Sequence, residues 1–167
     1  VYRYDAGGDN LILIATRGLD PESVGAVRMR VNEGLTGFVI ERREPVMAVD
    51  ALAHPRYKYF PETGEERYHS FLGVPILDKR QVRGVITAQT SRRRRFTLDE
   101  LRLLKAVAIP VGGILAQLEL MESLETKEEE RKNYKTRMLD AIKQLQGFER
   151  QREVSRKPQR ETAIRLS

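Results

Sequence analysis

Two apolar runs separated by a short polar break stand out in the hydrophobic pattern of the chain. The runs cover residues 71–77 and 82–88, and the break between them covers residues 78–81. Two β-rich runs joined by a few polar residues predict a β-hairpin. Because both runs are nearly continuously apolar, both faces of these strands are expected to be buried. The pattern therefore predicts a hairpin in the middle of a sheet, with helices packed on it.

Shorter elements surround this hairpin. A first hairpin is predicted where two short runs flank a loop of glycine, aspartate and asparagine, which tolerate the positive φ angles of tight turns. A glycine turn followed by apolar positions predicts a short helix that Pro45 ends. In chain order, the expected elements are strands at 1–4, 11–16 and 24–31, a helix at 35–43 and a strand at 46–50.

The connection at residues 51–68 is long, polar and rich in aromatic residues. It holds Tyr57, Tyr59, Phe60 and Tyr68. A loop of this composition either packs on the core as a lid or forms a wall of a ligand site. The pattern favours neither, so both interpretations stay open.

A long helix is predicted to begin at Thr97. Thr97 has the residue type of an N-cap, and Glu100 that of its partner in a capping box. Apolar residues then recur at steps of three and four from Leu101 to Leu118, which predicts a heptad seam. Pro110 interrupts the seam, and a proline inside a helix costs about 3 kcal/mol. We therefore expect a bend or break near residues 109–113.

Beyond Met121 the seam gives way to charged residues. It resumes from Tyr134 to Phe148, which predicts either one long helix or two helices with a turn near Thr126. The Lys-Pro pair at 157–158 is expected to end helical order. The predicted organisation is a domain at 1–120, a charged helical or coiled-coil linker at 121–157, and a tail at 158–167.

Composition limits the chemistry that is open to the chain. The 167 residues carry a formal net charge of +6 and include no cysteine, which excludes disulfides, thiolate metal sites and cysteine nucleophiles. No signal peptide and no apolar run of about 18 residues occurs, which fits a cytoplasmic protein without a membrane partner. The basic run at 92–95 lacks interleaved aromatics and a recognition helix, so no nucleic acid partner is predicted. Because the chain starts inside a predicted strand, it is expected to be an amino-terminally truncated fragment.

Candidate catalytic and metal-binding residues are few. The two histidines, His54 and His69, are far apart in the sequence and lack metal-ligand spacing. The aspartates lie in predicted turns, where local hydrogen bonding is their common role. The glycine turn at 34–37 is too short for a phosphate-binding loop and lacks its lysine. The chain itself is therefore expected not to be an enzyme, and no cofactor or metal is predicted.

Several motifs follow one another in an order that resembles the GAF domain, a sensory module related in shape to PAS domains. They cover residues 34–39, 45–50, 54–57, 70–76, 84–88 and 96–101. The resemblance extends over residues 1–120. It implies an α+β fold, in which an antiparallel β-sheet has helices on its faces and is followed by a carboxy-terminal helical segment. The run at 58–68 is similar to the amino-terminal GAF domains of nitrogen-related phosphoenolpyruvate-dependent phosphotransferases.

The resemblance also implies a function and a site. It implies a regulatory sensory domain that binds a small metabolite, with glutamine or 2-oxoglutarate as candidates. The domain would control a phosphoenolpyruvate-dependent phosphotransferase whose catalytic domains follow in cis. The metabolite would lie between the sheet and the connection at 50–68. The residues expected to contact it are Phe38, Val49, Asp50, Tyr57, Phe60, Ser70, Phe71, Gly73, Thr87 and Gln89.

These site residues differ in how informative they are. Phe38, Val49 and Phe71 fit plain core packing equally well. The polar members are more informative, because polar groups that face a core need a partner. That partner is protein, water or ligand, and the sequence does not distinguish between them. The residues that bind cyclic nucleotides in some GAF domains are not recognisable, so a cyclic nucleotide is not expected.

A second interpretation is a ligand-free dimerisation module. Side chains would then fill the pocket, and the apolar seams of the carboxy-terminal helices would hold a homodimer. Under this hypothesis Leu115 lies in the dimer contact, and a polar substitution there gives a monomer.

Overall fold

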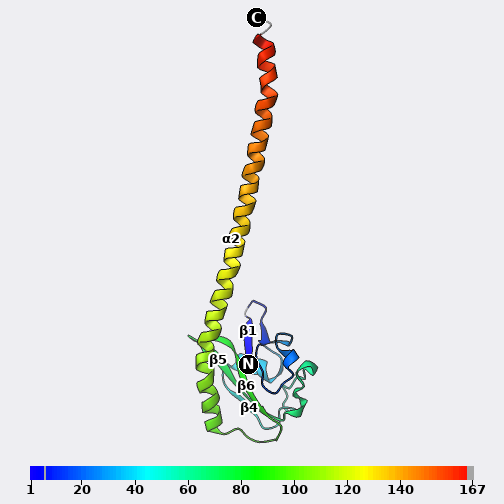
Figure 1. Ribbon diagram of the computed structural model, residues 1–167. Coiled ribbons are helices and arrows are strands. Elements are labelled where there is room, and N and C mark those ends of the chain that lie inside the picture. Colours follow the sequence, from blue (N-terminus) through cyan, green and yellow to red (C-terminus); the bar gives the residue numbers. More distant parts are fainter. Residues whose placement is uncertain (6, 165–167) are drawn as a thin grey trace. The chain divides into compact units, whose positions relative to one another are not determined.

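A computed structural model describes residues 1–5 and 7–164 and has an α+β fold (Figure 1). Six strands form one antiparallel sheet in the order β3-β2-β1-β6-β5-β4. The strands are β1 (Tyr2–Asp5), β2 (Asn10–Leu13), β3 (Arg28–Arg30), β4 (Val46–Ala48), β5 (Ser70–Asp78) and β6 (Gln81–Thr90). The α-helices are α1 (Gly34–Arg42) and α2 (Leu98–Ile164), and the 3-10 helices are η1 (Pro21–Ser23), η2 (Pro61–Thr63) and η3 (Glu65–Arg67). The predicted fold class is confirmed.

Contacts divide the chain into two units, Val1–Glu119 and Leu120–Ser167. The first unit contains the whole sheet, helix α1, the 3-10 helices and the start of α2. Every residue of the predicted ligand site lies in this first unit.

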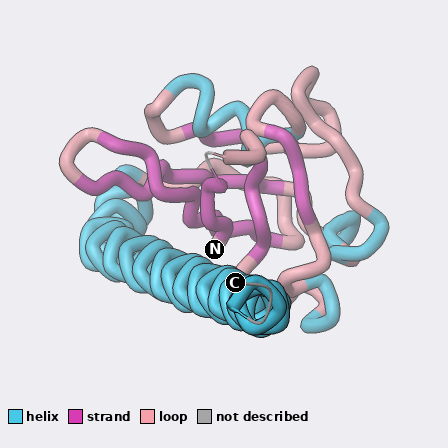
Figure 2. Tube along the Cα trace, turned by 90° about the horizontal axis from the view of Figure 1, so that it is seen from above, coloured by secondary structure: helices cyan, strands magenta, loops and turns pink. Residues whose placement is uncertain are grey.

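The predicted central hairpin is formed by β5 and β6, and both of its faces are buried. Phe71 packs on the side of α1, in a core that includes Val39. Its neighbour Leu72 packs on the opposite side, in a core that includes Leu115 of α2. Figure 2 shows the strands between α2 on one side and the loops and short helices on the other. This alternation explains why the two runs are continuously apolar.

The turn of this hairpin uses two residues with left-handed backbone. Lys79 has φ 45° and Arg80 has φ 71°, and the flanking Asp78 and Gln81 are paired. Positive φ at both central positions is typical of a type I′ turn, which favours Asn-Gly. A non-glycine residue in this conformation costs about 1–2 kcal/mol. Lys79 and Arg80 therefore occupy left-handed positions that glycine or asparagine would occupy at a lower cost.

Replacing the turn by Lys79→Asn with Arg80→Gly is expected to raise the free energy of unfolding by about 1 kcal/mol, because it relieves the left-handed strain. Urea unfolding followed by circular dichroism measures the change. Arg80→Ala removes most of the same side chain but keeps Cβ, so it should give no gain. A gain of equal size from Arg80→Ala would show that the side chain, and not the backbone, limits this turn.

Helix α2 begins as predicted. The backbone N–H of Glu100 donates to Oγ1 of Thr97 at 3.2 Å, and the N–H of Thr97 donates to Oε2 of Glu100 at 2.8 Å. This is the reciprocal pair of a capping box. The bond from Arg94 and the one from the Thr97 N–H lower the pKa of Glu100 to about 2. The carboxylate is therefore ionised over the physiological range and keeps the cap in place.

The prediction that helical order ends at residues 157–158 is wrong, because α2 passes through Pro158. Of the two alternatives left open near Thr126, the structure has the single long helix, and α2 also passes through Pro110 without interruption. At Pro110 the reason is visible, since this residue is exposed while Ala108 and Leu115 hold the opposite face against the sheet. Tertiary packing of this kind outweighs a lost backbone hydrogen bond. Whether the helix bends near Pro110 stays a prediction, and the side chain of Phe148 in the predicted second seam lies outside the described residues.

One segment of α2, Leu98–Gln144, has the length and apolar content of a membrane-crossing helix. Part of this apolar content is explained by packing, because Leu101, Leu104, Ala108, Val111 and Leu115 contact the domain's own sheet. The expectation that no part of the chain meets a membrane stays a prediction.

Candidate functional site

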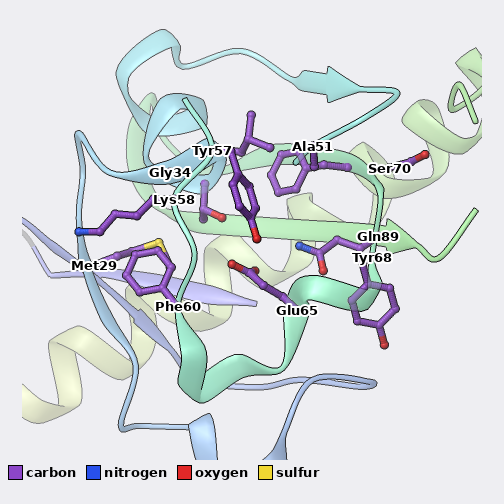
Figure 3. A pocket seen from close by; sticks show the side chains of 13 residues that line it. Met29, Gly34, Ala51, Tyr57, Lys58, Phe60, Glu65, Tyr68, Ser70 and Gln89 are labelled. Carbon is purple, nitrogen blue, oxygen red and sulfur yellow. The ribbon is translucent and has the colours of Figure 1, made fainter. Parts of the chain in front are cut away.

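A small cavity lies where the predicted site was expected, between the sheet and the connection that precedes β5. Its volume is about 30 Å³. The start of α1, the connection and the ends of β5 and β6 enclose it, and Figure 3 shows the lining side chains. We call residues 51–69 the lid, because this segment covers the cavity.

Glu65 is the central polar group of the cavity. Its side chain extends from η3 toward Gln89 and Tyr57 (Figure 3), and the amide of Gln89 donates a hydrogen bond to its carboxylate. Burial raises the pKa of Glu65 to about 7, well above its usual value. The negative charge of Glu65 in turn contributes to the raised pKa of Tyr57, after burial. The cavity thus contains a buried carboxyl group that changes its charge near neutral pH.

Sequence patterns alone do not indicate Glu65 as a site residue. The lid contains Glu62, Glu65 and Glu66 within a few polar positions, and their spacing does not distinguish them. The backbone at Gly64 determines which of these side chains points into the cavity, since its φ of 60° turns the chain between η2 and η3. Only glycine adopts this conformation readily, so the position after it is aimed inward.

The amino-terminal end of α1 forms the opposite wall of the cavity, where Gly34, Leu35 and Thr36 line it. Glu33 is the N-cap residue but does not cap the helix. Its carboxylate accepts instead from the N–H of Arg30 at 3.1 Å and from Nζ of Lys58 at 2.7 Å. The first N–H groups of a helix have no partner within the helix, and they carry its positive dipole end.

Thr36 adds a hydroxyl to this wall. The residue is 7% exposed and lines the cavity. A hydroxyl group can both donate and accept a hydrogen bond. The cavity therefore has a donor-rich wall at α1 and a carboxyl group at Glu65.

The structure brings five of the ten predicted site residues together at this cavity. They are Tyr57, Phe60, Ser70, Phe71 and Gln89. Of these, Ser70 points away from the cavity (Figure 3). Its hydroxyl oxygen lies 2.9 Å from the carbonyl oxygens of both Val49 and Arg92, so its single hydrogen is donated to one of them, and it accepts from the N–H of Arg94 at 2.8 Å. The partner that this buried hydroxyl needs is therefore protein.

The other five predicted residues lie elsewhere. Phe38 packs between the guanidinium groups of Arg42 and Arg56, and Val49 is 46% exposed. Asp50 forms an ion pair with Arg93 at 3.2 Å. Gly73 lies under Val39, since an added Cβ would come within 2.6 Å of its Cγ2, and Thr87 lines a neighbouring pocket.

This neighbouring pocket is larger, at about 540 Å³. Tyr68 and Gln89 line both hollows, so these two side chains separate them. Ligand pockets have volumes of about 300–1,000 Å³, whereas about 10–15 Å³ is enough for one water. The cavity under the lid thus has room for water only. A metabolite would fit there only after the lid moves, or after Tyr68 and Gln89 move and join the two hollows.

The lid is held by both polar and buried contacts. At the surface, Lys58 pairs with Glu33, Arg56 pairs with Glu41, and the hydroxyl of Tyr68 donates to the Gly18 carbonyl at 2.7 Å. Exposed ion pairs of this kind contribute about 0–1 kcal/mol each. Ala51 and Thr63 are buried, at 6% and 0% exposed, so movement of the whole lid would also uncover part of the core.

Comparisons with known proteins agree with this fold. A family model described as GAF domain matches residues 1–116. A curated protein of Escherichia coli K12, named phosphoenolpyruvate-dependent phosphotransferase system, is 38% identical over 120 residues, which cover 72% of this chain and 16% of that protein. The chain thus spans a small part of the length of the curated relatives it matches.

Two solved structures are similar as well. The GAF domain of a phosphoenolpyruvate-protein phosphotransferase from Coxiella burnetii has 35% identity and a TM-score of 0.68, with 73% of each chain covered. The corresponding GAF domain from Acinetobacter has 32% identity and a TM-score of 0.65, covering 73% of this chain and 72% of that one. The resemblance seen in the sequence motifs is confirmed, and the chain belongs to the GAF domain family.

Proposed function

We propose that this chain is a regulatory sensory domain that binds a small metabolite beneath the lid and controls a phosphoenolpyruvate-dependent phosphotransferase. The similar proteins named above support the connection to that system. The phosphotransfer domains would follow in cis, and the whole protein would act in the cytoplasm in a nitrogen-related phosphotransferase system. In this proposal the chain itself carries no catalytic group.

The observation that supports a ligand site best is the pairing of opposite polar walls in one cavity. Glu65 presents a carboxyl group, and the amino-terminal end of α1 presents N–H groups together with the hydroxyl of Thr36. A zwitterionic α-amino acid matches both walls. Its ammonium group would bind Glu65, and its carboxylate would bind the start of α1.

These two walls favour one of the two candidate metabolites over the other, because the metabolites differ in charge. Glutamine carries one ammonium group and one carboxylate, and its side-chain amide suits Gln89 or Tyr57. The dianion 2-oxoglutarate has no cation to offer Glu65, and its second carboxylate would repel the ionised form. We therefore propose glutamine as the preferred ligand, bound in an open or re-closed state of the lid.

The proposal predicts a ligand-dependent stabilisation that requires Glu65. Glutamine at 100 times its Kd should stabilise the protein by about 2.7 kcal/mol, while 2-oxoglutarate should give little shift. Glu65→Gln should abolish the glutamine shift, because it removes the charge that binds the ammonium group. Glu66→Gln, an exposed neighbour, should keep it.

Thermal unfolding with each metabolite, confirmed by titration calorimetry, measures this effect. If neither small amino acids nor keto acids at millimolar concentration shift the unfolding of the parent chain, a sensory role for this cavity is wrong. If glutamine acts equally on Glu65→Gln and on the parent, the cavity senses a ligand but Glu65 does not bind it.

The alternative of a ligand-free dimerisation module needs different residues from those expected. Leu115 is 2% exposed and packs in the core between α2 and the sheet. The expectation that it lies in a dimer contact is wrong, because the same three- and four-residue spacing serves packing on the domain's own sheet. A polar residue at this position would unfold the domain instead of separating two subunits.

A further inference from the structure

Strand β4 forms one edge of the sheet, and a hollow lies beside it. In the order β3-β2-β1-β6-β5-β4 this strand pairs with β5 only, so the N–H and C=O groups on its outer side have no strand partner among the described residues. The hollow has a volume of about 660 Å³. We call it the β4 groove, and its lining residues are Met47, Ala48, Val49, Arg95, Phe96, Thr97 and Leu98.

The walls of the β4 groove are mostly apolar, and part of this apolar surface is in contact with water. On the side of the strand, Met47 is 37% exposed and Val49 is 46% exposed. At the start of α2, Leu98 is 67% exposed. Covering apolar side chains of this kind with another chain is favourable, at about 25 cal/mol for each Å² of apolar surface removed from water. The groove therefore offers apolar contact to a partner.

The two edges of the sheet differ in how open they are to a further strand. At the other edge, β3 exposes Arg28 and Arg30 and buries Met29 between them. Charged side chains on an edge strand oppose its pairing with another chain. β4 has the reverse pattern, because its exposed middle residue is the apolar Met47. The edge at β4 is therefore the one that lacks this protection.

The basic run at residues 92–95 borders the β4 groove, since Arg95 lines it. Arg93 and Arg94 are each bound to a carboxylate of the domain, at 3.2 and 2.7 Å. Arg92 and Arg95 are exposed, and neither forms an ion pair within the described part of the chain. Two guanidinium groups beside an apolar groove are thus available to bind carboxylates of a partner.

We propose that the β4 groove binds an extended acidic segment of another protein, which adds to the sheet as a strand beside β4. Main-chain hydrogen bonds to the outer edge of β4 would hold this segment, as in other strand-addition complexes. Alternate side chains of an extended segment point to the same face, so every second residue would face Met47 and Val49 and should be apolar. Acidic residues that flank this apolar part would bind Arg92 and Arg95.

Two other occupants match these features less well. A second copy of this chain carries the same unpaired arginines beside the same groove, so it lacks the negative charge that would complement them. The hydrocarbon of a membrane offers no donors or acceptors to the unpaired backbone groups of β4. Apolar residues that line a hollow also fit an inserted side chain better than they fit a bilayer surface.

The test uses the full chain and a fluorescein-labelled peptide that has two glutamates at each end of a Val-Thr-Val-Thr-Val centre. Fluorescence anisotropy should show saturable binding that weakens as NaCl is added, because salt screens exposed ion pairs. The same peptide with lysines in place of the glutamates should bind at least about ten-fold more weakly. Successive N–H groups of a strand point to opposite sides, so methylating the N–H groups either of the valines or of the threonines should abolish binding.

Two matched pairs of variants locate the site. Val49→Gln should weaken peptide binding about ten-fold, because it removes apolar contact in the groove. Val24→Gln is its control, since Val24 is 40% exposed and precedes β3 at the opposite edge. Arg95→Gln should weaken binding and reduce its dependence on salt, whereas Arg28→Gln on β3 should do neither. Because all four side chains are exposed, the variants should unfold at the temperature of the parent in circular dichroism.

Three results would overturn the proposal. The first is a parent chain that does not bind the acidic peptide at millimolar concentration and low salt. The second is equal binding by the two members of either pair, or binding that survives both methylations. The third is a Val49→Gln defect with no peptide binding by the parent. If that defect is in flotation with vesicles of phosphatidylcholine and phosphatidylglycerol, the groove meets a membrane, and if it is in self-association, the groove meets a second copy. None of these results depends on whether the cavity beneath the lid binds glutamine.

Discussion

Glu65→Gln is expected to raise the free energy of unfolding at pH 8 by about 2–3 kcal/mol and to leave it nearly unchanged at pH 4. In the folded chain, burial raises the pKa of Glu65 from 4.5 to about 7. Each pH unit between these two values is worth about 1.4 kcal/mol, and partial exposure of the side chain reduces the total. The glutamine side chain keeps the shape of the residue without a charge to bury.

The sign of the effect follows from proton binding. Between pH 4.5 and 7 the folded chain keeps the proton of Glu65, while the unfolded chain has largely released it. The stability contributed by this group is therefore complete below pH 4.5 and is lost as the pH rises through about 7. Glu65→Gln does not lose this stability. The difference in the free energy of unfolding between the two proteins should therefore grow from pH 4.5 to about 7 and then level off.

Urea unfolding of both proteins from pH 4 to pH 8 measures the difference. Groups other than Glu65 are the same in both proteins, so their contributions cancel. Glu62→Gln is the control, because this carboxyl group is exposed and does not line the cavity, and it should change the free energy of unfolding at pH 8 much less. A constant offset between Glu65→Gln and the parent over the whole range would mean that Glu65 is not buried in solution.

The same burial cost links stability to the proposed ligand. An ammonium group bound at Glu65 would compensate the buried charge, so glutamine should stabilise the parent more at pH 8 than at pH 5. Burying the ionised carboxylate of Glu65 in the empty cavity is unfavourable. A ligand that carries a cation would remove this free-energy cost, so the site would select such a ligand.

Local signals in the sequence were sufficient for much of the fold. The apolar runs of the central hairpin and the capping box of Thr97 and Glu100 depend on neighbouring residues only, and both were predicted. Five of the ten candidate site residues line the cavity, among them Tyr57 and Phe60 of the lid and Gln89 of β6, and their contact with a ligand stays a prediction. These features need no knowledge of distant contacts.

Features that depend on contacts between residues distant in the sequence were not predicted. Glu65 could not be distinguished from Glu62 and Glu66, since a single left-handed glycine decides which carboxyl group turns inward. Under the dimerisation hypothesis the seam through Leu115 contacts a partner chain, whereas in the structure it packs on the domain's own sheet. A spacing of three and four residues defines a face of a helix but does not say what covers it.

The pair Gly112 and Gly113 illustrates the same limit and leads to a second large effect. Both glycines lie in the segment 109–113, where the sequence predicts a bend. In the structure they differ, since a Cβ on Gly112 would lie 2.3 Å from the carbonyl oxygen of Leu77, while a Cβ on Gly113 would meet nothing within 4 Å. Gly112 therefore allows α2 to approach the end of β5 closely, and Gly113 has no such role.

Alanine substitutions at these neighbours are expected to have opposite signs. Gly113→Ala should raise the free energy of unfolding by about 1 kcal/mol, because alanine favours the helix. Gly112→Ala gains the same helix term but must push the backbone of Leu77 away, and overpacking of this kind costs about 1–3 kcal/mol or more. We expect a net loss of about 2 kcal/mol, and so a difference of about 3 kcal/mol between the two variants.

Chemical unfolding of the two variants measures this difference, and the shared helix term cancels between them. A loss at both positions would mean that the helix does not run straight through residues 112 and 113. A gain at both would mean that α2 lies farther from β5 than described. In this second case the carbonyl group of Leu77 would not be in contact with α2.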